Sequence, residues 1–390
     1  MDRPALLQAA AAQAAALAGR EGEIEALRRL PDDVAEAMSA SSLWRALLPQ
    51  ALGGHEADPA SFFEAVEALA VADGAVGWCT MIACTASVMS AYLPPASAAA
   101  LYGRADLRAA GVFAPRGRAR AVVQEGRPGY LVSGRWAWGS AVHVAHVVSL
   151  GCMEVADDGS LLTQGPGGAP RTLTAVLPRA AVKTLDNWAS LGLRGTGSGE
   201  IEVSEVFVPA DHVVRVPGDA PLPRPLYRFP LFGLLALGIA AVASGRAQRA
   251  LQEFTALAQR KSSQDSRRLL AERATVQQAL AQAQARQRAA RAGVLAAVAS
   301  VWQQALAEAQ IGIEARSDLR LACSHAAHEA VAVAERLFSL AGGDAVFDGS
   351  ALQRAWRDVH VAQQHLMVAE PGFELFGKLL LGLPADTAML

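Results

Sequence analysis

Cysteine and net charge are both scarce in this sequence. Four cysteines are spread over 390 residues, without a CxxC pair or a cluster at ligand-like spacing. This scatter excludes a disulfide framework and a set of metal-binding thiolates, and it indicates a reducing compartment. The 35 basic and 37 acidic residues leave a net charge of −2. Nothing in this balance recruits nucleic acid or an anionic membrane surface.

Long hydrophobic runs are also few. The N-terminus is Ala-rich, and it lacks the basic region and the Leu-rich run of a signal peptide, so it predicts an amphipathic helix. One run, at 229–245, is a membrane candidate, but it is short for a span and holds three glycines and an early proline. It predicts a buried core helix, and we expect a cytoplasmic protein.

Three regions differ in their residue patterns, and together they predict an α+β fold that is mostly helical. Residues 1–111 show helical patterns with short breakers. Residues 112–215 hold short runs rich in Val and Thr, punctuated by Gly and Pro, as strands and turns are. Residues 226–390 hold four long helical patterns with short connections. The prediction is an N-terminal helical domain, a middle β-barrel or β-sandwich domain, and a C-terminal four-helix bundle. The crevice where three such domains meet is a preferred ligand site.

Seven short segments occur in an order that resembles one known family. They are LGGHEAD (52–58), ADGAVGW (72–78), GVFAPRG (111–117), SGRWAWGS (133–140), LGLRGTGSGEIEVSEVFVP (191–209), AGGDAVF (341–347) and LQRAWRDVHVAQQH (352–365). Over nearly the whole chain, the sequence resembles the acyl-CoA dehydrogenase superfamily. It is most similar to the oxygenase branch, the two-component flavin-dependent monooxygenases of the 4-hydroxyphenylacetate hydroxylase type. The resemblance implies reduced FAD or FMN as the cofactor.

The segment SGRWAWGS is similar to the strand that this family lays along its flavin. The resemblance implies that Trp136, Trp138 and Ser140 border the isoalloxazine, with the Ser140 hydroxyl bonded to the N5–O4 edge and acting in catalysis. From the residues alone, two Trp at i and i+2 point to the same sheet face, where they could equally fill the core.

Three further residues are implied as flavin contacts. Gly342 and Gly343 match a Gly-Gly element that touches the phosphate or ribityl part of the flavin, often on a neighbouring subunit. Arg260 matches an arginine on the first bundle helix that faces the pyrophosphate. The glycine-rich stretch 194–200 precedes a strand, so it is no dinucleotide fingerprint. It is either a turn or a close backbone approach to the ligand by 195–198.

Two histidines, His360 and His365, lie five residues apart in a pattern that predicts one helix. At 100° per residue they would face directions about 140° apart. The resemblance puts His365 where dehydrogenases of the superfamily carry a tyrosine, and Leu366 where many carry the glutamate base. Leucine cannot accept a proton, although Glu370, one turn further on, could partly compensate. His365 would then take a phenolic proton or hydrogen-bond the flavin C4a-hydroperoxide, whereas His360 would be structural.

The resemblance also implies a substrate pocket lined by Trp78, Thr85 and Leu366. Trp78 starts an inner wall helix, and Thr85 stands where some relatives carry a further active-site histidine. Beside these residues, Arg357 and Asp358 are expected to form an ion pair that holds the bundle or a subunit interface.

The expected function is oxygenation of an aromatic, phenolic or heteroatom-bearing small molecule by reduced flavin and O2. A separate NAD(P)H:flavin reductase is the expected partner, and the assembly a homotetramer or dimer. The alternatives are an acyl-thioester dehydrogenase that performs α,β-desaturation, and a non-catalytic flavin-binding assembly subunit.

Overall fold

The N-terminal third of the chain is helical. The computed structural model describes residues 1–165, 168–216, 218–262, 267–308 and 310–390. The first helices are α1 (Arg3–Ala16), α2 (Glu21–Leu27), α3 (Asp32–Ala40), α4 (Pro59–Ala72), α5 (Gly74–Ser87) and α6 (Pro95–Tyr102). The starts of α4 and α5 follow from local chemistry. The Asp58 carboxylate accepts from the Ser61 backbone N–H, and the Asp73 carboxylate accepts from that of Val76.

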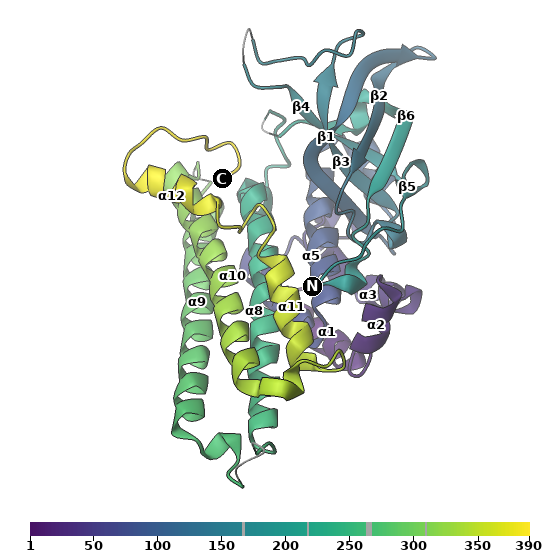
Figure 1. Cartoon of the computed structure of the whole chain (residues 1–390). Helices are drawn as coiled ribbons and strands as arrows, with labels where there is room; N and C mark the ends of the chain where they lie inside the picture. The colour runs from purple at the N-terminus through teal and green to yellow at the C-terminus, as the bar shows by residue number, and fades with distance from the viewer. Residues whose placement is uncertain (166–167, 217, 263–266, 309) are drawn as a thin grey trace.

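The described residues in the middle of the chain form one seven-stranded sheet. Its strands are β1 (Ala109–Gln124), β2 (Arg127–Trp136), β3 (Val147–Val155), β4 (Thr172–Pro178), β5 (Lys183–Thr184), β6 (Ile201–Pro209) and β7 (Val213–Val214). The strand order is β5-β6-β2-β1-β3-β4-β7, with β1 and β3 parallel and the other pairs antiparallel. The long strand β1 shifts register between Val112 and Gly117. Figure 1 shows the sheet above the N-terminal helices and beside the bundle.

The C-terminal half is a bundle of long helices. After the short α7 (Pro225–Arg228) come α8 (Leu231–Ala258), α9 (Ala274–Leu306), α10 (Ile313–Ala341), α11 (Ala351–Ala362) and α12 (Gly372–Leu380). Helices α8, α9, α10 and α11 pack on one another as the predicted four-helix bundle. The order of helices, sheet and bundle confirms the predicted fold class.

Among the residues that the structure describes, two helical segments are long and apolar enough to cross a membrane by length and composition: Gly74–Tyr92 and Leu231–Ala258. The most apolar windows of the two are 100% and 83% buried inside the protein. The run at 229–245 therefore belongs to a core helix, α8, which also packs against α4 and α5. Burial of this kind is typical of a helix at the centre of a hydrophobic core.

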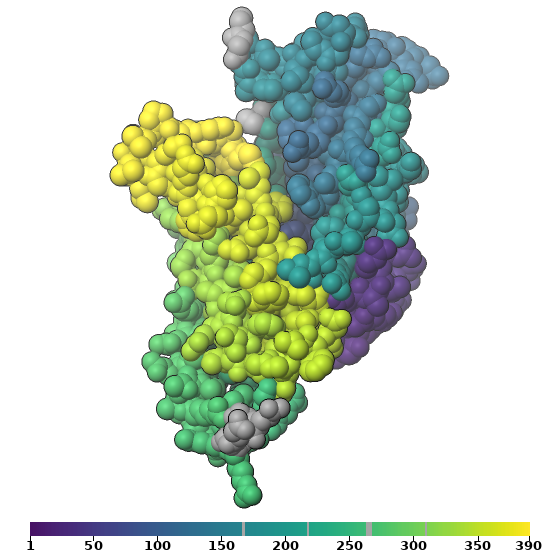
Figure 2. Space-filling model, in the orientation of Figure 1, coloured from purple at the N-terminus to yellow at the C-terminus, as the bar shows by residue number. Residues whose placement is uncertain are grey.

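The last predicted helix is shorter than its pattern indicated. Helix α11 ends at Ala362, and residues 363–371 form turns before α12 begins. His360 lies on α11, whereas His365 lies in these turns, so the helical angle between the two does not apply. Figure 2 shows this C-terminal segment, in yellow, on the surface of the bundle near the sheet domain.

Candidate active site

Three of the predicted site residues come together where the three regions meet. Trp78 on α5 donates its indole N–H to the Ser140 hydroxyl, with Nε1 and Oγ 3.1 Å apart. The ring of His365 lies against the same indole, with ring centroids 5.9 Å apart. Trp78 and Ser140 are 7% and 3% exposed, so the contact between them is shielded from water. One residue comes from each region.

Ser140 begins a chain of buried hydroxyls. Its Oγ lies 2.6 Å from that of Ser198, which in turn lies 2.6 Å from Oγ1 of Thr196. The Thr196 hydroxyl also donates to the Leu193 carbonyl at 2.8 Å. The glycine-rich stretch therefore contributes side chains to the junction, in addition to a turn. Sequence reasoning considered only its backbone and missed Ser198 and Thr196 as side-chain partners.

The turn that carries His365 is held from the bundle. Nε and Nη2 of Arg320, on α10, donate to the Met367 carbonyl at 3.2 and 2.9 Å. Within the turn, Nδ1 of His365 accepts from the Met367 backbone N–H at 3.2 Å. That bond makes Nδ1 an acceptor and leaves the proton of the neutral ring on Nε2. Burial, with a smaller effect of the Arg320 charge, lowers the pKa of His365 to about 4.

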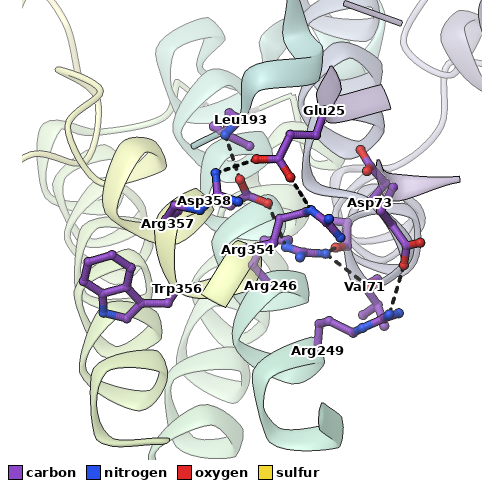
Figure 3. A network of polar contacts seen from close by, with 12 residues as sticks. Glu25, Val71, Asp73, Leu193, Arg246, Arg249, Arg354, Trp356, Arg357 and Asp358 are labelled. Atoms are coloured by element: carbon purple, nitrogen blue, oxygen red, sulfur yellow. Dashed lines mark hydrogen bonds and ion pairs between the residues drawn. The ribbon is translucent and has the colours of Figure 1, made fainter. Parts of the chain in front are cut away.

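An ion-pair network ties α11 to the rest of the protein (Figure 3). Asp358 and Arg357 do not pair with each other, which corrects the expectation from the sequence. The Asp358 carboxylate pairs with Arg246 of α8 at 3.2 Å and accepts from the Leu193 backbone N–H at 2.7 Å. Arg357 pairs with Glu25 of α2 at 2.6 Å. The network therefore joins α2, α8 and the loop that carries Thr196 and Ser198.

The two tryptophans of the SGRWAWGS segment lie in different environments, one buried and one exposed. Trp136 ends β2, is 0% exposed, and donates its indole N–H to the Gly151 carbonyl at 2.8 Å. A Cβ at Gly117 would lie 2.2 Å from this indole, so the ring fills the space over that glycine. In this structure Trp136 therefore has no exposed surface with which to border a flavin. Trp138 lies beyond the strand with φ 66°, and its side chain is 66% exposed.

The side chain of Thr85 lies in the core of the protein and does not line an open pocket. It is 1% exposed, and its hydroxyl donates to the Met81 carbonyl within α5 at 2.8 Å. The side chain is enclosed in the core with its hydroxyl satisfied, so it has no free surface or hydrogen for a substrate. Leu366, beside His365, is 64% exposed and remains available as a pocket wall.

Arg260, Gly342 and Gly343 gather at the far end of the bundle. Arg260 follows the end of α8, and the adjacent Lys261 donates to the Ala341 carbonyl at 2.8 Å, just before the Gly-Gly pair. Helix α8 contacts Met81, near the junction, at Gly238. Its last residue, Ala258, comes 20 residues after Gly238. At 1.5 Å per residue these places lie about 30 Å apart. The three residues therefore do not share a site with Ser140 of the same chain.

Two further polar residues, Glu370 and His360, make contacts with neighbouring residues of the bundle. Glu370 has an 80% exposed side chain and pairs with His328 at 3.4 Å, so it does not face Trp78 as a base would. His360 bonds the Trp356 carbonyl through Nδ1 at 2.7 Å and packs against the Trp356 ring. Both arrangements fit a structural role.

A groove of about 640 Å³ lies where α2, the loop 189–194 and the start of α11 meet. None of the predicted site residues lines it. Its three arginines, Arg28, Arg194 and Arg354, already pair with Asp186 or Glu25. The groove therefore lies apart from the junction of Trp78, Ser140 and His365.

The chain is similar to proteins of one family over most of its length. Residues 237–370 match the family model "Acyl-CoA dehydrogenase, C-terminal domain". The chain is 30% identical to an indole-3-acetate monooxygenase of Pseudomonas putida over 93% of this chain and 90% of that protein. It is 29% identical to the flavin-dependent monooxygenase oxygenase subunit HsaA of Rhodococcus jostii, over 95% and 97% of the two chains. The crystal structure of the HsaA monooxygenase from M. tuberculosis covers 100% of both chains, with a TM-score of 0.88 and 26% identity.

The chain therefore belongs to the flavin-dependent monooxygenases that share the acyl-CoA dehydrogenase fold. It is an oxidoreductase of the oxygenase type.

The junction suits a reduced flavin. The Ser140 backbone N–H donates to the Trp138 carbonyl at 2.8 Å, which keeps the exposed indole next to the buried hydroxyl in one tight turn. An exposed indole offers a flat apolar surface to a ring system, and a hydroxyl can donate to the polar edge of the same ring. Trp138, Ser140 and His365 are the residues that could hold the flavin ring and the molecule that reacts beside it.

Proposed function

We propose that this chain is the oxygenase component of a two-component system. It takes reduced FAD or FMN from a separate NAD(P)H:flavin reductase and inserts one oxygen atom of O2 into an aromatic molecule that bears a phenolic hydroxyl or a ring heteroatom. Its relatives are named for indole-3-acetate oxygenation and as an oxygenase subunit, which supports this class of substrate and the need for a reductase. We expect it to act in the cytoplasm, without a membrane or nucleic-acid partner.

The observation that carries the proposal is the contact of Trp78 with both Ser140 and His365. The reduced flavin supplies the electrons with which O2 is activated. An enclosed wall of this kind excludes water from the reacting atoms, which limits wasteful release of peroxide. Ser140 presents a hydroxyl toward the flavin edge, and His365 faces the space between flavin and substrate.

The tautomer of His365 defines its role. Nδ1 is engaged by the Met367 N–H, so the free nitrogen, Nε2, carries the proton and can only donate. A pKa near 4 keeps the ring neutral at pH 7. We therefore assign His365 as a hydrogen-bond donor that orients an oxygen atom of the reacting molecules, rather than as the base that removes a phenolic proton.

We further propose that two or four copies assemble so that the far end of one bundle completes the flavin site of a neighbour. Arg260, Gly342 and Gly343 would bind the phosphate portion across that interface. The adjacent side chains of Val346 and Phe347 are 59% and 69% exposed. Such neighbouring apolar groups at a bundle end are typical of a surface that another subunit covers.

The experiment combines the purified chain with a flavin reductase, NADH and each of two aromatic acids, indole-3-acetate and 4-hydroxyphenylacetate. Mass spectrometry after reaction in ¹⁸O2 measures the label in the product. The proposal predicts one labelled atom per product molecule, and no product when the chain or the reductase is left out. Anaerobic oxidation of an acyl-thioester, without any labelled product, would contradict it.

A further inference from the structure

Three enclosed hydroxyls stand between a group that can only donate and a group that can only accept. The donor is the Trp78 indole N–H, 3.1 Å from the Ser140 oxygen, and the acceptor is the Leu193 carbonyl, 2.8 Å from Oγ1 of Thr196. Ser198 links the other two hydroxyls at 2.6 Å on each side. Ser140, Ser198 and Thr196 are 3%, 5% and 1% exposed.

The number of hydrogens fixes the direction of this chain. Each hydroxyl has one hydrogen to donate. In the flavin-free protein, all three hydroxyl hydrogens find an acceptor only if Ser140 donates to Ser198, Ser198 to Thr196, and Thr196 to the Leu193 carbonyl. In that arrangement the single hydrogen of Ser140 is already used, and none is left for a ligand beside it.

The chain can also run the other way. The Leu193 carbonyl accepts two further hydrogen bonds, from the Thr196 backbone N–H at 3.1 Å and from the Trp188 indole N–H at 3.3 Å. It therefore stays satisfied when the Thr196 hydroxyl turns away. Thr196 can then donate to Ser198, and Ser198 to Ser140. Both bonds between the hydroxyls persist, and the Ser140 hydrogen is free for a neighbour.

We propose that these hydroxyls act as a reversible switch. Thr196 and Ser198 are positioning residues that occupy the Ser140 hydrogen in the flavin-free protein and release it to the acceptor edge of a bound flavin. The inference rests on the proposed function, because it takes the flavin as the acceptor beside Ser140. In the released arrangement Ser140 accepts from both Trp78 and Ser198, which polarises its O–H bond and makes it a stronger donor.

The test is the Thr196→Val variant, which removes one hydroxyl with little change of shape. Without Oγ1 of Thr196, the hydroxyl hydrogen of either Ser198 or Ser140 has no acceptor in the flavin-free variant. Bound flavin provides that acceptor, because Ser198 can then donate to Ser140 and Ser140 to the flavin. The flavin-free protein should therefore melt at a lower temperature, while its affinity for reduced FMN or reduced FAD in anaerobic titration should rise about three- to tenfold. A residue with a merely structural role would not raise affinity while it lowers stability.

A double-mutant cycle makes the mechanism specific. In a Ser140→Ala background the unpaired Ser198 hydrogen has no acceptor with or without flavin, so Thr196→Val should no longer change affinity. Ser198→Ala should raise affinity in the same direction, and it serves if Thr196→Val does not fold. The matched control is Ser87→Ala, because Ser87 is a buried α5 serine bonded to the Cys84 carbonyl. It should lower stability without a change in affinity.

Three outcomes would overturn the switch, and two of them concern the switch alone. One is an unchanged or lower affinity in both Thr196→Val and Ser198→Ala, and the other is a gain that persists without the Ser140 hydroxyl. If Ser140→Ala itself leaves flavin affinity unchanged, the proposed flavin contact of Ser140 fails and the switch fails with it. These results separate an error in the switch from an error in the proposed flavin contact.

Discussion

Asp358→Asn should destabilise the flavin-free protein by about 3 kcal/mol. Removing one partner of a buried ion pair costs about 3–5 kcal/mol, because the other charge stays buried without compensation. Asp358 and Arg246 are 4% and 1% exposed and 3.2 Å apart. Two features place the cost at the lower end. Arg246 keeps its bond to the Ala70 carbonyl at 3.0 Å, and the new amide oxygen can still accept from the Leu193 N–H.

Equilibrium urea unfolding at pH 7, followed by circular dichroism, measures this loss. The control is Asp106→Asn, because Asp106 pairs with Arg104 at the surface, where both side chains are more than half exposed. Such pairs contribute about 0–1 kcal/mol. If Asp358→Asn and Asp106→Asn unfolded at the same urea concentration as the unmutated protein, the argument from buried charge would be refuted.

Three further predictions follow from the site. Ser140→Ala should weaken reduced-flavin binding by about 1–3 kcal/mol in anaerobic titration, because an enclosed acceptor on the flavin loses the Ser140 hydroxyl as its donor. Glu370→Gln should leave product formation near the unmutated level, because that carboxylate is 80% exposed and turned toward His328; a loss of turnover would revive the carboxylate as a base. Burial lowers the pKa of His365 from 6.5 to about 4, so the neutral ring stabilises the fold fully above pH 6.5, and this stability is lost as the pH falls toward 4. The melting temperature of His365→Gln should therefore fall less over that window than that of the unmutated protein.

Much of the fold could be predicted because its signals are local. The start of α4 is one example, since Asp58 before Pro59 is an N-cap followed by a residue suited to the first helical turn. The four bundle helices are another, because long patterns with short connections leave few alternatives. The end of α11 had no such signal. No Gly or Pro lies between Ala362 and Pro371, and the turn there is fixed by Arg320, a residue distant in sequence.

The site was less predictable because it depends on backbone geometry and on contacts between regions. Alternation along a strand puts Trp136 and Trp138 on one face, but β2 ends at Trp136, and the positive φ of Trp138 turns its side chain elsewhere. Ser198 follows Gly197, which has φ +60°. The pattern of residues in such a loop does not reveal which side chain points inward, so the hydroxyl chain emerges from the structure alone.

The central claim is that oxygenation takes place beside His365. The most direct test compares His365→Ala with His360→Ala at equal flavin occupancy, with reductase, NADH, O2 and an aromatic substrate. The measured quantity is the ratio of oxygenated product to released hydrogen peroxide. This ratio should fall by about tenfold or more in His365→Ala, because the half-buried ring loses its hydrogen-bond donor, and it should stay near the unmutated ratio in His360→Ala. An unchanged ratio in His365→Ala would contradict the account.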